Sequence, residues 1–391
     1  MSEKVVKLGI VGLNGMGGVH AQRILSGLVP RLKITALCDL NEKVLESYKE
    51  HKDVGLFTDS SEMIKSGIID AVLIATPHFF HSVIGIEALQ AGLHVLVEKP
   101  ISVHKAEAEK LIAARQNDNQ IFCGMFNLRA EPHYMKIHSM LENGELGKIT
   151  RINWITTKWF RSEAYYSAVR WRATWKGEGG GVLVNQCTHQ LDLWAWFFGM
   201  PKNVRANCYF GKYHDIEVED EVTAFMEYDD GVTGVFITTT GEAPGTNRLE
   251  ITGDRGKLIF ENSELKFYRN EVETSKFSKT TNNAFEEPDC WDIVVPCEEN
   301  NDQHKIILQN FTDSILDEKP LIAPGEEGIK AVELANAFLY SSLTNQTVEF
   351  PLDSKEFEKY FNKLVGNSDG FDKKKVRKDV NTSLKKSFNK L

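Results

Sequence analysis

Apolar and polar positions follow two different patterns along the chain, one before and one after residue 128. In the first part, short apolar runs alternate with segments whose apolar residues recur at helical spacing. Such runs are typical of strands in a parallel sheet that is buried on both faces. The pattern predicts an α/β fold with an N-terminal doubly wound parallel sheet. Its strands are expected at 8–11, 32–38, 70–75, 94–97 and 120–126.

After residue 128, polar and apolar residues alternate over short stretches separated by turn sequences, of which Asp229-Asp230-Gly231 is typical of a hairpin. The pattern predicts an α+β second part with a mostly antiparallel sheet. Strands are expected at 148–155, 204–210, 222–228, 232–240, 248–252 and 257–260, and helices at 132–143, 305–318 and 326–344. The expected domains are 1–128 and 129–365. A basic tail follows at 366–391, for which a solvated or disordered end is favoured over a nucleic-acid contact.

Composition narrows the class of protein. The 391 residues are 42% hydrophobic and 26% charged, as in an ordinary water-soluble protein, and suffice for more than one domain. A net charge of -9 argues against a general nucleic-acid binder, and no apolar run approaches the ~20 residues of a membrane span. The six cysteines show no metal-like spacing, and the first strand leaves no room for a preceding signal peptide. We expect a cytoplasmic protein without a metal.

A glycine-rich turn follows the first expected strand. Gly12 and Gly17 match the outer glycines of G-x-G-x-x-G, and Asn14 replaces the middle one, which asparagine can do because it tolerates positive φ. A helix and a second strand ending at Asp39 complete the pattern of a dinucleotide-binding unit, although an ordinary strand-to-helix turn is the alternative. No arginine follows Asp39 to meet a 2′-phosphate, so NAD is favoured over NADP. The expected cofactor contacts of this unit are Gly12, Leu13, Asn14, Gly15, Met16 and Asp39.

Polar residues end the later strands of the expected parallel sheet, where ligands of such sheets bind. Thr76-Pro77 follows one strand, Glu98-Lys99-Pro100 the next and Asn127 the last. A partly buried lysine beside a positively charged ring has a lowered pKa and can exchange a proton with an alcohol. Lys99 is therefore a candidate catalytic residue, with a surface lysine at a strand end as the alternative.

A second cluster begins at three glycines, 179–181, which permit close approach of the backbone to a ligand. Asn185, His189 and Asp192 follow at spacings of four and three, which would place them on one face of a helix. A histidine held by polar neighbours can carry a proton. The alternative is a hydrogen-bonded histidine in the protein core.

Together these motifs resemble the Gfo/Idh/MocA oxidoreductases, in the same order from residue 6 to about residue 350. The motifs that carry the resemblance are Gly12–Gly17, Asp39, Thr76-Pro77 with His81, Glu98-Lys99-Pro100, 127–129, 144–147, Trp171-Arg172 and 179–192. The resemblance implies a Rossmann domain followed by an α/β domain with a large open sheet, whose outer face commonly builds dimers or tetramers. It also implies pyranose or cyclic-polyol substrates and reversible hydride transfer with NAD or NADP.

The resemblance also assigns roles to single residues. Lys99 is similar to the lysine that hydrogen-bonds the reacting hydroxyl, and His189 to the general acid/base. Asn185 stands where many members have aspartate; it can hold the substrate but cannot accept a proton. The other implied substrate contacts are Arg129, Lys158, Tyr165 and Arg172. The other implied cofactor contacts are Thr76, Pro77, His78, His81, Glu98, Lys99, Asn127, Trp171 and Arg172.

The resulting hypothesis is an NAD-dependent dehydrogenase that oxidises a secondary hydroxyl of a sugar, glycoside or cyclic polyol. Lys99 and His189 would handle the proton, and a homodimer or homotetramer is expected. The first alternative is a glycoside hydrolase that retains NAD and acts by transient oxidation and elimination. The second is a non-catalytic regulator that binds the nucleotide, an alternative suggested by Asn185, which cannot accept a proton.

Overall fold

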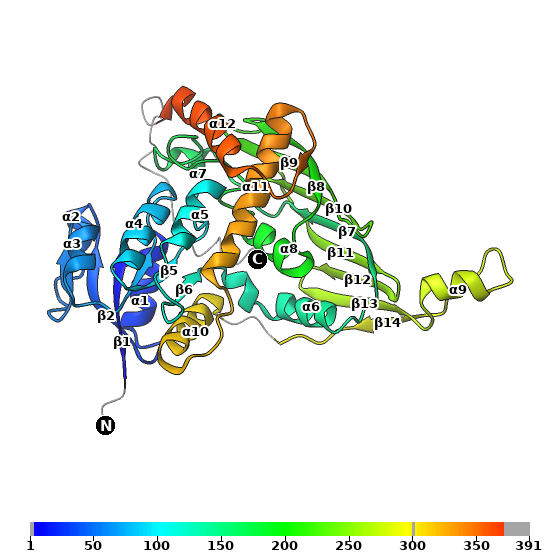
Figure 1. Ribbon diagram of the computed structural model, residues 1–391, viewed down its shortest axis with the longest axis horizontal. Coiled ribbons are helices and arrows are strands. Elements are labelled where there is room, and N and C mark those ends of the chain that lie inside the picture. Colours follow the sequence, from blue (N-terminus) through cyan, green and yellow to red (C-terminus); the bar gives the residue numbers. More distant parts are fainter. Residues whose placement is uncertain (1–3, 299–301, 371–391) are drawn as a thin grey trace.

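The computed structural model describes residues 4–298 and 302–370, which form two β-sheets with helices packed against them (Figure 1). Within these residues the first sheet has six parallel strands in the order β3-β2-β1-β4-β5-β6. The predicted doubly wound parallel sheet is therefore confirmed. The chain adds β2 and β3 on one side of β1 and then β4, β5 and β6 on the other side. Its strands are β1 (Val6–Val11), β2 (Leu32–Cys38), β3 (Gly55–Phe57), β4 (Ala71–Ile74), β5 (His94–Val97) and β6 (Phe122–Gly124).

Five helices connect these strands: α1 (Met16–Leu25), α2 (Glu42–Glu46), α3 (Ser60–Lys65), α4 (Phe79–Gln90) and α5 (Lys105–Ala113). Two of them begin at side chains that cap free backbone N–H groups. Asn41 accepts a hydrogen bond from Lys43 N at 3.2 Å, and Asp59 accepts one from Glu62 N at 3.0 Å. Such short polar residues before an amphipathic stretch explain why these helices start where they do.

The second sheet has nine strands within the described residues, in the order β14-β13-β12-β11-β7-β10-β9-β8-β15. Neighbouring strands are antiparallel except β7 and β10, which are parallel. The predicted mostly antiparallel sheet is confirmed. Its strands are β7 (Ile149–Thr156), β8 (Asn203–Phe210), β9 (Glu219–Glu227), β10 (Thr233–Thr239), β11 (Asn247–Gly253), β12 (Gly256–Glu261), β13 (Glu264–Asn270), β14 (Cys290–Val294) and β15 (Val348–Glu349).

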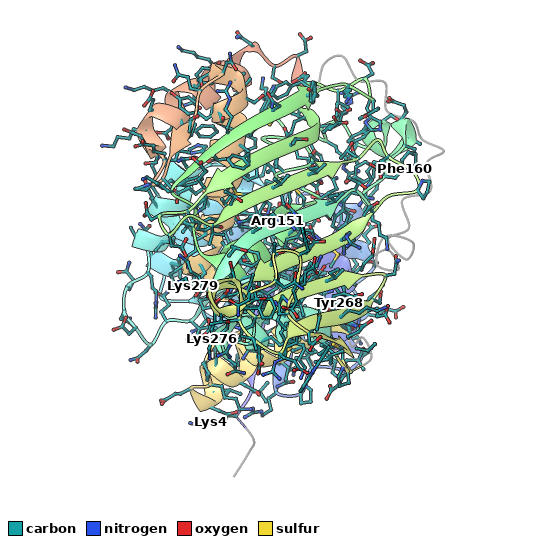
Figure 2. All side chains as sticks on the ribbon, turned by 90° about the vertical axis from the view of Figure 1, so that its right-hand side faces the viewer. Lys4, Arg151, Phe160, Tyr268, Lys276 and Lys279 are labelled. Atoms are coloured by element: carbon teal, nitrogen blue, oxygen red, sulfur yellow. The ribbon has the colours of Figure 1, made fainter. Side chains whose placement is uncertain are left out.

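Helices cover one face of this large sheet, and the other face is open except where α9 (Thr274–Thr280) projects from one end of it (Figures 1 and 2). Trp194 packs on the covered face, with its ring 6.5 Å from that of Trp154 and 5.9 Å from that of Phe236. Arg151 and Tyr268 lie on the open face (Figure 2). The remaining helices are η1 (Asn127–Ala130), α6 (Pro132–Glu142), α7 (Glu163–Ser167), α8 (Thr188–Phe198), α9 (Thr274–Thr280), α10 (Gln303–Asp317), η2 (Gly325–Glu327), α11 (Gly328–Thr344) and α12 (Ser354–Asn367).

Helix α10 returns from the second part of the chain to the first sheet, where it lies near α1 (Figure 1). Ion pairs hold it there: Arg31 contacts Asp313 at 2.8 Å, and Arg23 contacts Asp302 at 2.8 Å. The first turn of α10 carries His304, which is thereby placed next to α1.

The domain limits at residues 128 and 365 stay predictions. Most of the predicted basic tail, residues 371–391, lies outside the described residues. Where the structure describes the chain, no helix is both long and apolar enough to span a membrane.

Candidate active site

A cavity of about 700 Å³ lies at the carboxyl ends of the parallel strands. One side of it is formed by the turn after β1 and by Asp39 after β2, and the other by residues 159–189 from the second part of the chain. Fourteen of the fifteen predicted cofactor contacts line it. These are Gly12, Asn14, Gly15, Met16, Asp39, Thr76, Pro77, His78, His81, Glu98, Lys99, Asn127, Trp171 and Arg172.

The glycine turn leaves no room for side chains at its two ends. Gly12 has φ 84°, and a Cβ on Gly17 would lie 1.7 Å from the carbonyl oxygen of Gly12. The other positive φ of the turn falls on Gly15, at 69°, and not on Asn14. The tolerance of asparagine for positive φ is therefore not what preserves the turn.

Asp39 is held at the tip of β2 by the backbone. Its Oδ2 accepts a hydrogen bond from Leu13 N at 2.8 Å, and its Oδ1 accepts one from Asn41 N at 2.9 Å. Leu13 is the one predicted cofactor contact that does not line the cavity, because its side chain is buried in the core. Its backbone N–H instead orients the carboxylate that faces the cavity.

Several buried polar atoms in the cavity wall have no hydrogen-bond partner among the residues that the structure describes. They are Thr76 Oγ1, Asn127 Oδ1, Trp159 Nε1 and His189 Nδ1. Buried polar groups are normally paired, so these atoms fit a polar ligand that would satisfy them. Together with the open glycine turn and Asp39, they fit a dinucleotide that extends from β2 to the end of β5.

Lys99 and His189, 90 residues apart in sequence, line this same cavity. Lys99 Nζ donates a hydrogen bond to the backbone oxygen of Asn185 at 2.7 Å, with Asn185 Oδ1 at 3.4 Å. Burial lowers the pKa of Lys99 toward the neutral amine, opposed by the carboxylates of Glu98 and Glu178. Burial, and then the charge of Lys99, hold the pKa of His189 well below its usual value. Both shifts favour the neutral forms of these side chains, which are the forms that can accept a proton.

Asn185 and its neighbours connect Lys99 to the rest of the wall. Asn185 Nδ2 donates hydrogen bonds to Glu178 Oε1 and, at 3.3 Å, to the hydroxyl of Tyr165, which also accepts one from Gln186 Nε2 at 3.1 Å. Asn185, Tyr165 and Arg172 line the cavity, where Arg172 lies 4.0 Å from the centre of the Tyr165 ring.

Two family models match most of the chain. The model described as "Oxidoreductase family, NAD-binding Rossmann fold" matches residues 6–125, and the one described as "Oxidoreductase family, C-terminal alpha/beta domain" matches residues 138–350. The chain belongs to the Gfo/Idh/MocA oxidoreductase family. It is thus an oxidoreductase with an NAD-binding Rossmann domain.

This Gfo/Idh/MocA oxidoreductase is similar to named proteins over most of its length. It is 23% identical to the uncharacterized oxidoreductase YrbE of Bacillus subtilis, over 85% of this chain and 93% of that protein. It is 24% identical to the myo-inositol 2-dehydrogenase of Thermotoga maritima, over 66% and 75% of the two chains.

Solved structures share its fold. The WlbA dehydrogenase of Bordetella pertussis, in complex with NADH and UDP-GlcNAcA, superposes with a TM-score of 0.75 at 23% identity, over 90% of this chain and 100% of that one. A levoglucosan dehydrogenase in complex with NADH and levoglucosan gives 0.74 at 19% identity, over 89% and 100%.

Two sequence-based placements in this oxidoreductase need correction. Helix α8 begins at Thr188, so Asn185 lies in the preceding turn and not on a helical face with His189 and Asp192. The turn persists because Asn185 N donates to Gly181 O at 3.0 Å and Cys187 N to Val182 O at 2.8 Å. The third residue of the expected face, Asp192, forms an ion pair inside the protein.

Asp192 pairs with Arg129, which the resemblance had assigned to the substrate. Arg129 is 2% exposed; it contacts Asp192 through Nη2 at 2.7 Å and through Nε at 2.8 Å, and it also pairs with Glu327. It does not line the cavity, because these carboxylates hold it inside the protein. Lys158 lies beyond the end of β7 and is not among the residues that line the cavity, and its contact with the substrate stays a prediction.

No sequence motif pointed to several residues of the wall: Trp159, Arg161, Gln186 and His304. Gln186 could have been found by its place beside Asn185, whereas His304 arrives with α10 from a distant part of the chain. Burial lowers the pKa of His304 to about 4, which keeps it neutral. In the described part of the chain, no cluster of three or more His, Cys, Asp or Glu side chains could hold a metal ion.

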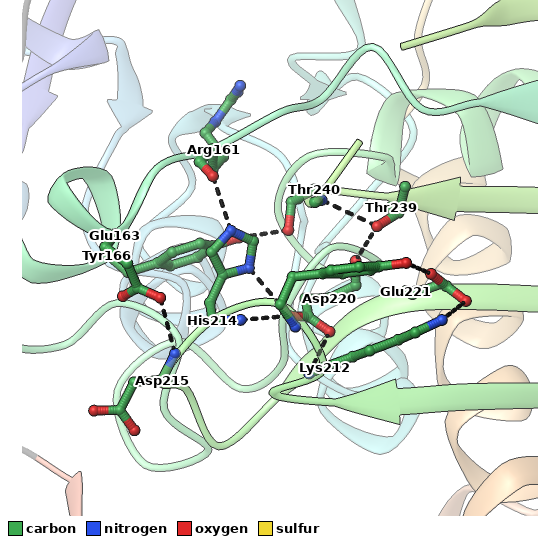
Figure 3. Close-up of polar contacts among 12 residues, drawn as sticks. Arg161, Glu163, Tyr166, Lys212, His214, Asp215, Asp220, Glu221, Thr239 and Thr240 are labelled. Atoms are coloured by element: carbon green, nitrogen blue, oxygen red, sulfur yellow. Dashed lines mark hydrogen bonds and ion pairs between the residues drawn. The ribbon is translucent and has the colours of Figure 1, made fainter. Parts of the chain in front are cut away.

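The segment that carries Arg161 is supported from behind by a loop between β8 and β9 (Figure 3). His214 Nε2 lies 2.8 Å from the backbone oxygen of Arg161, and its Nδ1 lies 3.0 Å from Asp220 Oδ2. Tyr166 packs against the His214 ring and donates to Thr240 Oγ1 at 2.8 Å. This support fixes the cavity wall at Arg161 and Tyr165.

Glu219 holds the glycine segment 179–181 and predicts a pH dependence of stability. Its Oε1 accepts hydrogen bonds from Gly181 N and Leu183 N, yet burial raises the pKa of its carboxyl from 4.5 to about 7. The stabilising contribution of this proton is complete below pH 4.5 and is lost as the pH rises through 7. Glutamine does not titrate, so the difference in unfolding free energy between Glu219→Gln and the native chain should change with pH. Measured by urea titration, it should shift in favour of the variant by about 2–3 kcal/mol from pH 5 to pH 8. An equal difference at both pH values would contradict the assignment.

Proposed function

We propose that this oxidoreductase is an NAD-dependent dehydrogenase that oxidises a secondary hydroxyl of a sugar, glycoside or cyclic polyol. The observation that supports it is the presence of Lys99 and His189 in one cavity with the glycine turn and Asp39. The names of the relatives, a myo-inositol 2-dehydrogenase and a levoglucosan dehydrogenase, point to the same class of substrate.

Each part of the wall has a role in this proposal. The turn at Gly12–Gly17 and Asp39 would hold the dinucleotide, and Asn127, Trp171 and Arg172 its nicotinamide half. NAD bound there would supply the hydride acceptor. Lys99 and His189 hold the substrate hydroxyl and accept its proton, while Asn185 and Tyr165 orient the ring. Trp159 offers an apolar surface to the C–H face of a sugar.

The test is a panel of inositols, monosaccharides, glycosides and anhydrosugars with NAD and with NADP, followed by reduced-nicotinamide absorbance. The proposal expects NADH to accumulate with at least one free sugar or polyol. Release of an aglycone without net NADH would instead support the NAD-retaining hydrolase. Binding of NAD with no turnover on the whole panel would support a non-catalytic regulator.

Cofactor choice is expected to depend on the charge of Asp39. A carboxylate accepts hydrogen bonds from ribose hydroxyls and repels a 2′-phosphate, so Asp39→Asn removes the charge at little change in shape. The ratio of kcat/KM for NAD to that for NADP should fall by about tenfold or more. Measurement with both cofactors on one substrate checks this. An unchanged ratio in a folded variant would show that another group sets the preference.

We also propose that the open face of the large sheet pairs two copies of the chain. A hollow there is lined by Ile155, Val235 and Ile237 together with Arg248 and Glu250. Apolar strand residues without a covering helix are typical of an interface. Sedimentation velocity should give a dimer or tetramer, and Ile237→Asp should shift it toward monomer. A native chain that sediments as a monomer at micromolar concentration would contradict this proposal.

A further inference from the structure

A carboxylate that no motif predicted stands directly behind the wall of the active site. Glu178 precedes the three glycines and is 1% exposed. It does not line the cavity, although it is buried against residues that do. Its Oε2 accepts a hydrogen bond from the backbone N of Ala173 at 2.5 Å, and its Oε1 accepts one from Asn185 Nδ2. The carboxylate is thus one hydrogen bond away from the residue that contacts Lys99.

The carboxylate determines which way the Asn185 amide points. Burial raises the pKa of Glu178, and this shift is opposed by the charge of Arg172 and by the hydrogen bonds from Ala173 and Asn185. In its ionised form the carboxyl group only accepts hydrogen bonds, so it faces the NH₂ group of the amide. Asn185 Oδ1 is thereby left on the side of Lys99, at 3.4 Å from Nζ. The three side chains are thus connected in sequence: the Lys99 amine faces the amide oxygen of Asn185, and the amide nitrogen of Asn185 faces the Glu178 carboxylate.

We propose that Glu178 is a positioning residue for Lys99, acting through Asn185. Glu178 fixes the orientation of the Asn185 amide. It also supplies a negative charge behind Asn185, whereas an aspartate at position 185 would place that charge directly against the lysine. The inference rests on the proposed role of Lys99 in the dehydrogenase. It explains how a site with asparagine at this position keeps an ordered and electrostatically balanced lysine.

The charge on Lys99 is set by several groups from different elements. Burial lowers the pKa of the amine most; the carboxylates of Glu98 and Glu178 raise it, and Arg161 lowers it. Lys99 also acts on the pKa values of three histidines around the cavity: His78, His81 and His189. Of these groups, Glu178 alone reaches Lys99 through the amide of Asn185 by hydrogen bonds within the described residues.

The experiment measures the pKa of Lys99 in the chain alone, without NAD or substrate. Trace acetylation with acetic anhydride from pH 6 to pH 11, followed by mass spectrometry of the Lys99 peptide, reports the fraction of neutral amine. Four forms are compared: native chain, Glu178→Gln, the double variant Glu178→Gln/Asn185→Asp, and Glu219→Gln. Glu219 is the matched control, because it is a buried acid at the start of β9 that contacts the same glycine segment, but it accepts its hydrogen bonds from Gly181 N and Leu183 N and not from Asn185.

Glu178→Gln should lower the labelling pKa of Lys99 by about one pH unit, since it removes a nearby opposite charge. Glu219→Gln should leave it unchanged. The double variant returns the charge at position 185, and its pKa should be at or above the native value. A Glu178→Gln value equal to the native one overturns the proposal, as does a double variant below the native value. The second comparison remains decisive if Glu178→Gln alone does not fold.

This measurement fails independently of the proposed function. If no sugar or polyol is oxidised but the labelling pKa follows Glu178, the dehydrogenase assignment is wrong and the link to Lys99 stands. If NADH forms and the labelling pKa of Lys99 is the same in Glu178→Gln as in the native chain, only the positioning role of Glu178 is wrong. With a substrate in hand, the acidic limb of the kcat–pH profile for oxidation by Glu178→Gln should shift in the same direction as the labelling pKa, because Lys99 acts as its neutral amine.

Discussion

Replacement of Lys99 by alanine is expected to reduce kcat by about 10²–10⁴-fold, the usual contribution of a positioned acid–base group. The amine lies in the cavity beside Asn185 and His189, and burial lowers its pKa toward the form that takes a proton. NAD binding should remain, because the glycine turn and Asp39 do not contact this side chain. Steady-state kinetics and fluorescence titration with NADH give the two quantities.

The matched control for this variant is Lys110→Ala. Lys110 is an exposed lysine paired with Glu358 at 3.3 Å, away from the cavity. Its removal should leave kcat unchanged and alter stability by less than about 1 kcal/mol. Nearly native turnover by Lys99→Ala would show that the proton goes elsewhere.

Arg129→Met is expected to lower the free energy of unfolding by about 3–5 kcal/mol, because it leaves the buried carboxylate of Asp192 without its partner. Both side chains of this pair are 2% exposed. The double variant Arg129→Met/Asp192→Leu should recover most of the loss, since an apolar pair leaves no buried charge. Urea unfolding of the three chains measures these differences.

Lys110→Met serves as the control, since Lys110 pairs with Glu358 at 3.3 Å away from the open face and its side chain is 61% exposed. Its cost should stay below about 1 kcal/mol. If Arg129→Met kept native stability and instead raised KM for the substrate, the structural role of this arginine would be wrong and the role implied by resemblance would return.

The local features of the fold could be predicted from the sequence because each depends on nearby residues. A buried run such as Leu8–Val11 has few options besides an inner strand, and the turn after it needs glycine where a Cβ would meet the backbone. Asp39 and Lys99 were found because they end such strands. The short strand β3 gave no comparable signal, since its three residues are only partly buried.

Features that depend on distant partners could not be predicted in this way. Arg129 is polar and close to a motif, and only its contacts with Asp192 and Glu327 show that it belongs to the interior. His304 reaches the cavity because ion pairs hold α10 near α1. Glu178 resembled any acid before a glycine run, and its contact with Asn185 became visible only in three dimensions.

The most direct test of the account is a crystal structure of this oxidoreductase with NADH bound. We expect the adenosine ribose on Asp39, the pyrophosphate over the turn at Gly12–Gly17, and the nicotinamide ring beside the space between Lys99 Nζ and His189. A dinucleotide whose nicotinamide ring lies away from both side chains would contradict it.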